Sequence, residues 1–331
     1  MEKDQHIAVL GGGSWATALV KLLSNNVKQL TWFMRNYSDI EYIRKHHHNP
    51  RYLSDVELNT SKIQLFDNIN KAVETADILL FAIPSAFLEN ALDKLTVEIK
   101  NKKVISAIKG IVPEHDLIIA DYLNQEYSVP LKHIGVVAGP CHSEEVALER
   151  LSYLTIASQD NQLAEYFASQ LQCRYLHTFT SDDIFGTEYS AVLKNIYALA
   201  AGICHGLGYG DNFQAVLISN AIREIERFAN TVHPIGRDIK DSAYLGDLMV
   251  TAYSNFSRNR QFGSMIGKGY SVKTVFVEMN MVAEGYYATK TIDSINRNYN
   301  VDMPIAKAVY NILYGKKQAS AEIRILTQLL T

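Results

Sequence analysis

The sequence predicts a doubly wound α/β domain followed by an all-α C-terminal domain. Apolar runs at residues 78–83, 103–107 and 134–138 lack polar alternation, which is typical of strands buried on both faces of a parallel sheet. Strand and helix patterns alternate to about residue 180, after which strand runs largely disappear and long helical patterns follow. A chain of 331 residues is also longer than one core usually serves. We therefore expect one domain over residues 1–182 and a second over residues 183–331.

The elements can be placed in order along the chain. A short apolar run at residues 7–10 ends in Gly11-Gly12-Gly13, and a helical pattern follows over residues 15–23. A second strand is expected at residues 30–33. In the C-terminal half, Asp211 can cap a helix with apolar residues at helical spacing over residues 213–225. The glycines at 202, 206, 208 and 210 are expected to form the turn before that helix.

Composition excludes several classes of function. A net charge of -3 provides no field for nucleic acid or an anionic membrane surface. Three scattered cysteines without a CxxC pair argue against a disulfide framework or a zinc site and suit a reducing compartment. The first strand begins too early for a signal peptide, and the apolar runs fall short of the roughly 20 residues that span a bilayer. We expect a cytoplasmic protein, and we interpret the internal His46-His47-His48 as solvated surface rather than a metal site.

The first turn carries a dinucleotide-binding pattern. Gly11, Gly13 and Ala16 form GxGxxA between a strand and a helix. The first glycine permits a tight turn, the second lets the backbone approach a pyrophosphate, and a small third residue lets the helix pack on the strand. The helix N-terminus supplies free N–H groups and a favourable dipole for phosphate. A plain glycine turn is the alternative, but it does not explain the sheet pattern that follows.

The end of the second predicted strand bears on the choice of cofactor. An acidic residue there accepts the ribose hydroxyls of NAD, whereas arginine pairs with the 2′-phosphate of NADP. The sequence here runs Thr-Trp-Phe-Met-Arg-Asn over residues 31–36, with Arg35 and no acid. This favours NADP or use of both cofactors, although Arg35 could equally be an exposed cation.

Three segments of the C-terminal half contain candidate catalytic groups. Lys194 lies in an otherwise apolar helix, where partial burial would lower its pKa toward the working pH; a lysine that reaches the surface is the commoner alternative. Asp247 is surrounded in the sequence by apolar residues, so its charge needs an ion-pair partner such as Lys194. The alternative is that it only caps a helix. The run of residues 257–260, Ser-Arg-Asn-Arg, suits phosphate oxygens, with a basic surface turn equally expected.

Together these segments resemble the bacterial-type NAD(P)-dependent glycerol-3-phosphate dehydrogenases over nearly the whole chain. The motifs follow one another at compatible spacing, so the set is far more specific than any one of them. They are Gly-Gly-Gly-Ser-Trp-Ala-Thr-Ala-Leu (11–19), Ile83-Pro84-Ser85, Ile108-Lys109-Gly110, Ala138-Gly139-Pro140, Leu193-Lys194-Asn195 with Ala200-Ala201-Gly202-Ile203, Leu245-Gly246-Asp247-Leu248, Ser257-Arg258-Asn259-Arg260 and Ala283-Glu284-Gly285.

The resemblance implies a Rossmann domain and a helical substrate domain, usually in a homodimer. It implies reversible reduction of dihydroxyacetone phosphate to sn-glycerol 3-phosphate with NADP or NAD, which feeds glycerophospholipid synthesis. Lys194 would exchange the proton at the substrate hydroxyl, Lys109 would polarise the carbonyl near both substrate and cofactor, and Asp247 would orient Lys194 or the substrate. The other substrate residues would be Gly139, Asn195, Thr251, Ser257, Arg258 and Asn259. The cofactor residues would be Gly11, Gly13, Ser14, Trp15, Arg35, Lys109, Ser143, Arg258 and Glu284, with no metal.

The chain departs from the family pattern at several positions. Cys141 replaces a serine or threonine after the Gly-Pro motif, and Tyr189 and Tyr244 stand where smaller residues are usual, so Tyr244 could narrow the pocket. Two other functions remain open. One is a different β-hydroxyacid-type dehydrogenase, against which the phosphate-binding run at 257–259 speaks. The other is a non-catalytic NADP sensor, which has no need of a proton-transfer lysine.

Overall fold

The computed structural model describes residues 5–279 and 283–331. The chain divides into two compact units, the first formed by Met1–Ile108 with Ile119–Ile184 and the second by Lys109–Ile118 with Phe185–Thr331. The chain therefore passes between the units three times. Among the described residues, no helix combines the length and the apolar character needed to span a bilayer.

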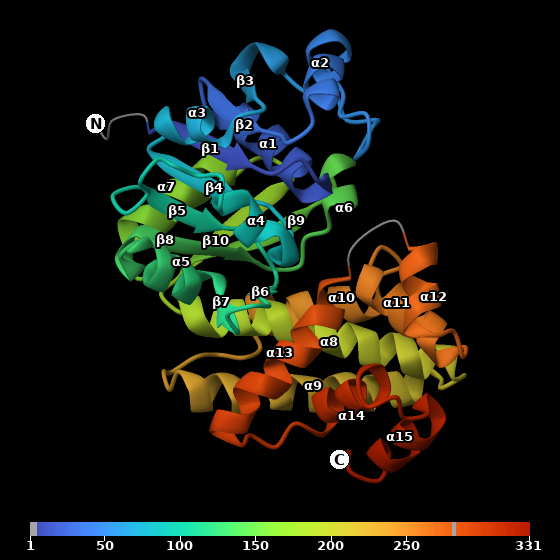
Figure 1. The fold of residues 1–331 in the computed structure, drawn as a ribbon. Coiled ribbons are helices and arrows are strands. Elements are labelled where there is room, and N and C mark those ends of the chain that lie inside the picture. Colours follow the sequence, from blue (N-terminus) through green and yellow to red (C-terminus); the bar gives the residue numbers. More distant parts are fainter. Residues whose placement is uncertain (1–4, 280–282) are drawn as a thin grey trace. The chain divides into compact units, whose positions relative to one another are not determined.

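The first unit is built on an eight-stranded sheet with the strand order β10-β9-β8-β5-β4-β1-β2-β3 (Figure 1). Every neighbouring pair is parallel except β8 and β9. The order β3-β2-β1-β4-β5 is that of a dinucleotide-binding sheet. The apolar runs near residues 78, 103 and 134 form β4, β5 and β8, which confirms the predicted buried strands. The strands are β1 (Ile7–Leu10), β2 (Leu30–Phe33), β3 (Ile63–Phe66), β4 (Ile78–Phe81), β5 (Lys103–Ser106), β8 (Ile134–Ala138), β9 (Ser152–Ser158) and β10 (Leu176–Ser181).

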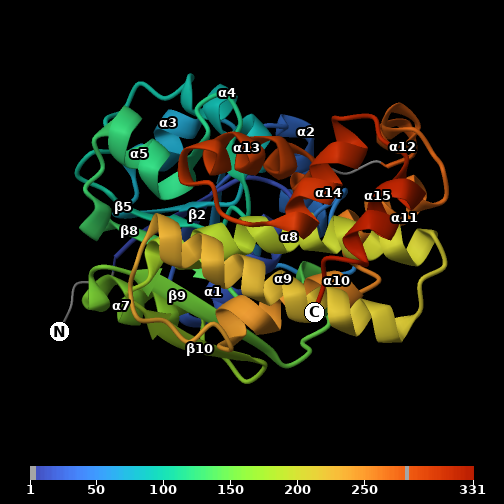
Figure 2. The same cartoon turned by 90° about the horizontal axis from the view of Figure 1, so that it is seen from below.

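Helices cover both faces of this sheet. In Figure 2, α1 and α7 lie on one face, and α3 and α5 lie on the other. The side chains of Asn36, Asn68 and Asp160 accept hydrogen bonds from first-turn N–H groups of α2, α3 and α7, so polar residues begin these helices. The helices are α1 (Ser14–Asn26), α2 (Tyr37–His46), α3 (Ile69–Glu74), α4 (Leu88–Leu92), α5 (Ile119–Tyr127), α6 (Ser143–Ala147) and α7 (Asn161–Leu171).

The described residues of the second unit form helices and one short hairpin. The hairpin of β6 and β7 contributes Ile111 and Ile118 to the apolar core of the helices. The long helices α8 and α9 run side by side (Figure 2), and the buried Glu224 of α9 accepts hydrogen bonds from the N–H groups of Ile305 and Ala306 at the start of α14. The elements are β6 (Ile111–Val112), β7 (Leu117–Ile118), α8 (Ile184–Gly206), α9 (Asp211–Val232), α10 (Asp247–Tyr253), α11 (Arg258–Gly267), α12 (Val272–Glu278), α13 (Glu284–Tyr299), α14 (Pro304–Leu313) and α15 (Ala319–Leu326).

Two details of the helical half differ from the sequence prediction. Gly202 and Gly206 lie inside α8 rather than in the following turn, because α11 packs there backbone against backbone. A Cβ on Gly202 would collide with the backbone of Arg260, and one on Gly263 would collide with α8. The cap of α9 is Gly210, whereas Asp211 is the first residue of the helix. Its negative charge there interacts favourably with the helix dipole.

Candidate active site

Two lysines share one buried carboxylate in the helical unit. The Lys194 ammonium of α8 pairs with Oδ1 of Asp247, the first residue of α10, and Nζ of Lys109 lies 3.5 Å from Oδ2 of the same residue. Lys194 is 3% exposed and Asp247 is 1% exposed, so Lys194 does not reach the surface. The predicted pairing of Lys194 with Asp247 is therefore present, and Lys109 adds a second positive charge.

Burial determines the protonation of this cluster. Removal from water lowers the pKa of Lys194, Asp247 opposes this effect, and the nearby Lys109 charge adds to it; together they bring the pKa to about 7. A lysine with this pKa exists in both protonation states near neutral pH. It can therefore give or take a proton there, as a group in reversible proton transfer must.

The local backbone explains how Asp247 reaches the lysines. A π-helical turn, Ser242–Gly246, leads directly into α10. Such turns change the direction of side chains relative to a regular α-helix and recur at functional sites. The Thr251 hydroxyl donates to the backbone carbonyl of Asp247 at 2.6 Å, which ties the first turn of α10 to the next one.

A second set of contacts links four segments next to the ion cluster. The Asn195 amide donates to the backbone carbonyl of Lys109 at 2.8 Å, and the Asn259 amide donates to Oδ1 of Asn195 at 2.9 Å. Oδ1 of Asn259 accepts the N–H of Gly285 at 2.9 Å, at the start of α13. A Cβ on Gly285 would lie 2.6 Å from the carbonyl oxygen of Asn195, so only glycine fits this approach. The set fixes the backbone that carries Lys109.

The predicted phosphate run opens helix α11. The Ser257 side chain caps this helix by accepting the N–H of Arg260, and Asn259 is buried in the contacts above. Arg258 is only partly buried. The sequence predicts that the side chains of all three residues bind phosphate; those of Ser257 and Asn259 also hold the start of α11. A guanidinium such as that of Arg258, at the start of a helix, is chemically suited to an anion.

The residues that depart from the family pattern are accommodated in the interior. Tyr189 is buried in the core of the helical unit, where its ring meets Phe228 edge to face at 5.2 Å. Tyr244 lies in the same core, within the π-helical turn. Cys141 is buried in the first unit. The larger volumes of Tyr189 and Tyr244 are thus taken up by packing.

The glycine turn in the first unit has the features of a dinucleotide site. Gly11 has φ +132°, and any Cβ there would collide with the carbonyl of Ala82. A Cβ on Gly13, the cap of α1, would meet nothing within 4 Å. Open space in front of the N-terminus of a 13-residue helix suits a pyrophosphate. These residues therefore fit the cofactor.

The other predicted cofactor residues occupy several elements. Ser14 and Trp15 begin α1, Ser143 begins α6, and Arg35 is exposed just after β2. Gly139, predicted as a substrate residue, has φ +125° and follows β8. Glu284 begins α13 in the helical unit. Among the described residues, no group of three or more His, Cys, Asp or Glu side chains is arranged to hold a metal.

Two buried side chains at the glycine turn were not singled out from the sequence. The Trp32 indole donates to the carbonyl of Gly11 at 2.6 Å, and the Asn49 amide donates to the carbonyl of Gly12 at 3.3 Å. Asn49 follows three histidines and precedes Pro50, a composition typical of a surface loop. No local pattern marks it as buried, but it has no exposed surface.

Comparisons with known proteins place the chain in one family. Residues 6–164 match the NAD-dependent glycerol-3-phosphate dehydrogenase N-terminus, and residues 183–324 match the corresponding C-terminus. A glycerol-3-phosphate dehydrogenase [NAD(P)+] of Macrococcus caseolyticus is 34% identical over 310 residues, which are 93% of each chain. One from Streptococcus agalactiae is 36% identical over 312 residues, 94% of this chain and 92% of that one.

Solved structures agree on the fold. The glycerol-3-phosphate dehydrogenase of Coxiella burnetii matches with a TM-score of 0.90 at 23% identity, covering 98% of this chain and 99% of the other. The Saccharomyces cerevisiae enzyme matches with a TM-score of 0.81 at the same identity, covering 97% of this chain and 98% of that one. The sheet order and the matches over both halves lead to one conclusion: the chain belongs to the NAD-dependent glycerol-3-phosphate dehydrogenase family.

Proposed function

We propose that this chain catalyses the reversible, NAD(P)-dependent reduction of dihydroxyacetone phosphate to sn-glycerol 3-phosphate, a precursor for glycerophospholipids. The observation that carries the proposal is the buried Lys194, whose pKa lies at about 7 beside Asp247 and Lys109. A secondary alcohol and its ketone are interconverted by hydride and proton transfer, and this cluster is suited to the proton. When bound, the reduced nicotinamide supplies the hydride.

In the reducing direction, Lys194 acts as the acid. Its ammonium group donates a proton to the carbonyl oxygen of the substrate as that oxygen becomes a hydroxyl. Lys109 presents a second positive charge, which stabilises negative charge developing on the same oxygen. Asp247 pairs with both ammonium groups and thereby keeps them together, and its charge favours the protonated form of Lys194. In the oxidising direction, neutral Lys194 takes the proton back.

The remaining site residues are assigned to substrate and cofactor. Ser257, Arg258 and Asn259, with the start of α11, bind the substrate, chiefly its phosphate, and Ser257 and Asn259 also hold that helix start in place. Asn195, Thr251 and Gly139 complete the substrate site. Gly11, Gly13, Ser14, Trp15, Lys109, Ser143, Arg258 and Glu284 line the cofactor, with Arg35 at its ribose. Residues 1–182 serve as the cofactor domain, apart from residues 109–118, which join the helices, and residues 183–331 serve as the substrate domain, in a cytoplasmic homodimer.

The cofactor preference follows from Arg35. It is exposed just after β2, where the adenosine ribose of a dinucleotide lies in this fold class. A guanidinium at this position pairs with a 2′-phosphate, so we propose that NADPH is preferred over NADH.

The test mixes the protein with dihydroxyacetone phosphate and either NADPH or NADH, in parallel assays. The loss of absorbance of the reduced nicotinamide is then followed over time. We expect oxidation of both, faster with NADPH at low concentration, and none with unphosphorylated dihydroxyacetone. Cofactor binding without any turnover would overturn the proposal and favour a sensor. Turnover with unphosphorylated hydroxy acids would indicate another dehydrogenase of the same fold. Light scattering during size-exclusion chromatography tests the homodimer.

A further inference from the structure

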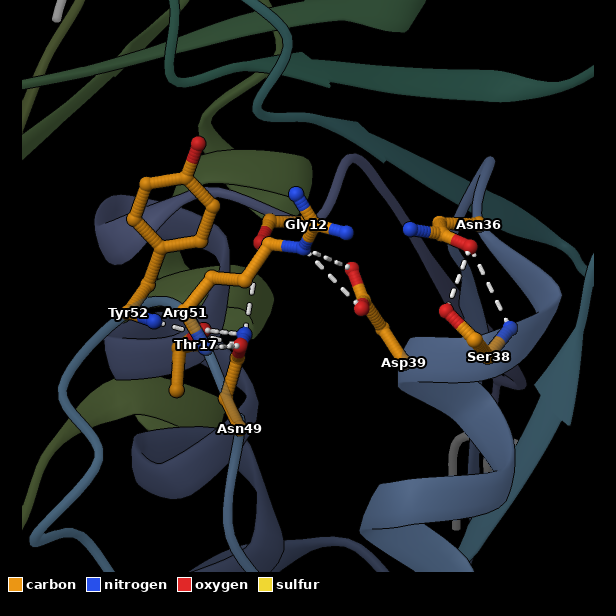
Figure 3. Close-up of polar contacts among 8 residues, drawn as sticks. All are labelled: Gly12, Thr17, Asn36, Ser38, Asp39, Asn49, Arg51 and Tyr52. Carbon is orange, nitrogen blue, oxygen red and sulfur yellow. Dashed lines mark hydrogen bonds and ion pairs between the residues drawn. The ribbon is translucent and has the colours of Figure 1, made fainter. Parts of the chain in front are cut away.

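The three carbonyl groups of the glycine turn, residues 11–13, all accept hydrogen bonds from buried side chains. The Trp32 indole donates to the first at 2.6 Å, the Asn49 amide donates to the second at 3.3 Å, and the Thr17 hydroxyl donates to the third at 3.0 Å. Asn49 also donates to the Thr17 hydroxyl at 2.8 Å. Asn49 therefore acts on two of the three carbonyls, one directly and one through Thr17 (Figure 3).

Asn49 uses its whole side-chain amide in this arrangement. The nitrogen makes the two donations above, and the oxygen accepts the N–H groups of Arg51 at 3.0 Å and Tyr52 at 3.2 Å. Figure 3 shows the contacts of Asn49 with Gly12 and Thr17 and with the backbone of Arg51 and Tyr52, which follow it in the same loop. Because an amide both donates and accepts, it can join these two backbone segments; a carboxylate or an aliphatic side chain of similar size cannot.

The direction of a carbonyl fixes the direction of the N–H on the same peptide. The peptide unit is planar and trans, so its C=O and N–H point to opposite sides. Holding the carbonyls of Gly12 and Gly13 therefore turns the N–H groups of Gly13 and Ser14 away from Asn49. N–H groups at the start of a helix have no acceptor within the helix and are the groups that bind phosphate.

We propose that Asn49 is a positioning residue for the dinucleotide: it holds the turn so that the N–H groups of Gly13 and Ser14 already face the pyrophosphate before the cofactor binds. This inference rests on the proposed cofactor site. Asn49 itself does not touch the cofactor or the substrate in this role. Donors fixed in advance lose less conformational freedom on binding, so the benefit appears in cofactor affinity.

The experiment compares full-length variants by NADPH fluorescence titration and by steady-state kinetics. For Asn49→Ala we expect the Kd and KM for NADPH to rise about tenfold. The kcat at saturating NADPH should stay within about threefold, and the KM for dihydroxyacetone phosphate should not change, because the proton-transfer groups are untouched. If Asn49 contributed only to the stability of the fold, its loss would not raise the Kd and KM for NADPH while leaving kcat and the KM for dihydroxyacetone phosphate unchanged.

The matched control is Asn70→Ala in the same unit. The Asn70 amide donates to the carbonyl of Lys94 at 2.9 Å and accepts the N–H groups of Thr96 and Val97 at 2.7 and 3.3 Å, so it too joins two segments of backbone. It lies outside the glycine-turn contacts. We expect a similar loss of thermal stability and an unchanged Kd for NADPH.

If Asn49→Ala does not fold, a pair of variants at Thr17 tests the positioning role instead. Thr17→Val keeps the shape of the side chain but removes the hydroxyl, whereas Thr17→Ser keeps the hydroxyl. We expect weaker NADPH binding only for the valine variant. Unchanged NADPH affinity in Asn49→Ala, or in Thr17→Val where that variant decides, would overturn the positioning role alone. A wild-type protein that binds neither NADPH nor NADH would overturn the proposed function as well.

Discussion

Replacing Asp247 with asparagine tests how the carboxylate controls Lys194. The substitution keeps the shape of the side chain and removes the charge that raises the pKa of Lys194 against the effects of burial and Lys109. Without that charge, the pKa of Lys194 should fall below about 7. Less of the lysine would then carry the proton needed for ketone reduction at neutral pH.

The magnitude follows from Coulomb's law. Opposite unit charges about 4 Å apart attract by about 4 kcal/mol at an effective dielectric constant of about 20, and the Lys194–Asp247 contact is closer than that. At about 1.4 kcal/mol per pKa unit, loss of an attraction of this size corresponds to about three pKa units. Rearrangement of Lys109 and entry of water reduce it, so we expect a fall of about one to two units. The protonated fraction at pH 7 would then drop from about one half to between about one tenth and about one hundredth.

The assay is kcat/KM for dihydroxyacetone phosphate from about pH 5 to about pH 9, which reports the free enzyme. In the wild type, reduction should decline as pH rises through about 7, and oxidation of glycerol 3-phosphate should rise over the same range, because the two directions need opposite forms of Lys194. In Asp247→Asn, both midpoints should move to lower pH, and reduction should recover in acid. Asp293→Asn is the control, since Asp293 also bridges two cations, Arg297 and Lys307. An Asp247→Asn midpoint equal to that of the wild type would refute the reasoning.

Three further substitutions test other parts of the structure. Lys194→Met should lower kcat by a factor of about 10² to 10⁴ with an unchanged Kd for NADPH; a kcat within a few-fold of wild type would remove the lysine from proton transfer. Arg35→Ala should raise the KM for NADPH about tenfold and leave that for NADH nearly constant, and an equal effect on both cofactors would contradict contact with a 2′-phosphate. Burial raises the pKa of Glu224 to about 7 from 4.5, so the stability that this group contributes below about pH 4.5 should be lost as pH rises through about 7. Urea denaturation should therefore show Glu224→Gln gaining up to about 3 kcal/mol on the wild type between pH 5 and pH 8, whereas a constant difference would mean that Glu224 is ionised throughout.

The sequence predicted the parts of the fold that local patterns encode. The central strands β1, β4 and β8 are continuous apolar runs, because both of their faces are covered, and β5 is buried from Val104 to Ser106. Strand β10, at the edge of the sheet, is mostly polar and shows no such run. The antiparallel pairing of β8 with β9 depends on contacts between distant segments, which local patterns do not report.

Only part of the candidate site could be predicted from the sequence, because some of its contacts join distant segments. The pairing of Lys194 with Asp247 follows from the high free energy of burying one charge alone. The approach of Lys109 to Asp247 does not, because residues 109–118 leave the sheet unit and join the helices. The roles of Ser257 and Asn259 in holding α11 required the helix start itself. Asn49 was missed because its burial comes from the glycine turn, 37 positions earlier in the chain.

The short hairpin of β6 and β7 affects how this chain can be divided or assembled. Its residues Ile111 and Ile118 belong to the apolar core of the helices, yet they are made well before α8. During synthesis this apolar segment remains exposed to solvent until the helices emerge from the ribosome. A fragment ending at Ile184 would keep the hairpin without its core, and a fragment starting at Phe185 would lack both isoleucines and Lys109. Neither half is a self-sufficient module, so exchange of the cofactor domain between relatives has to carry residues 109–118 with the helices.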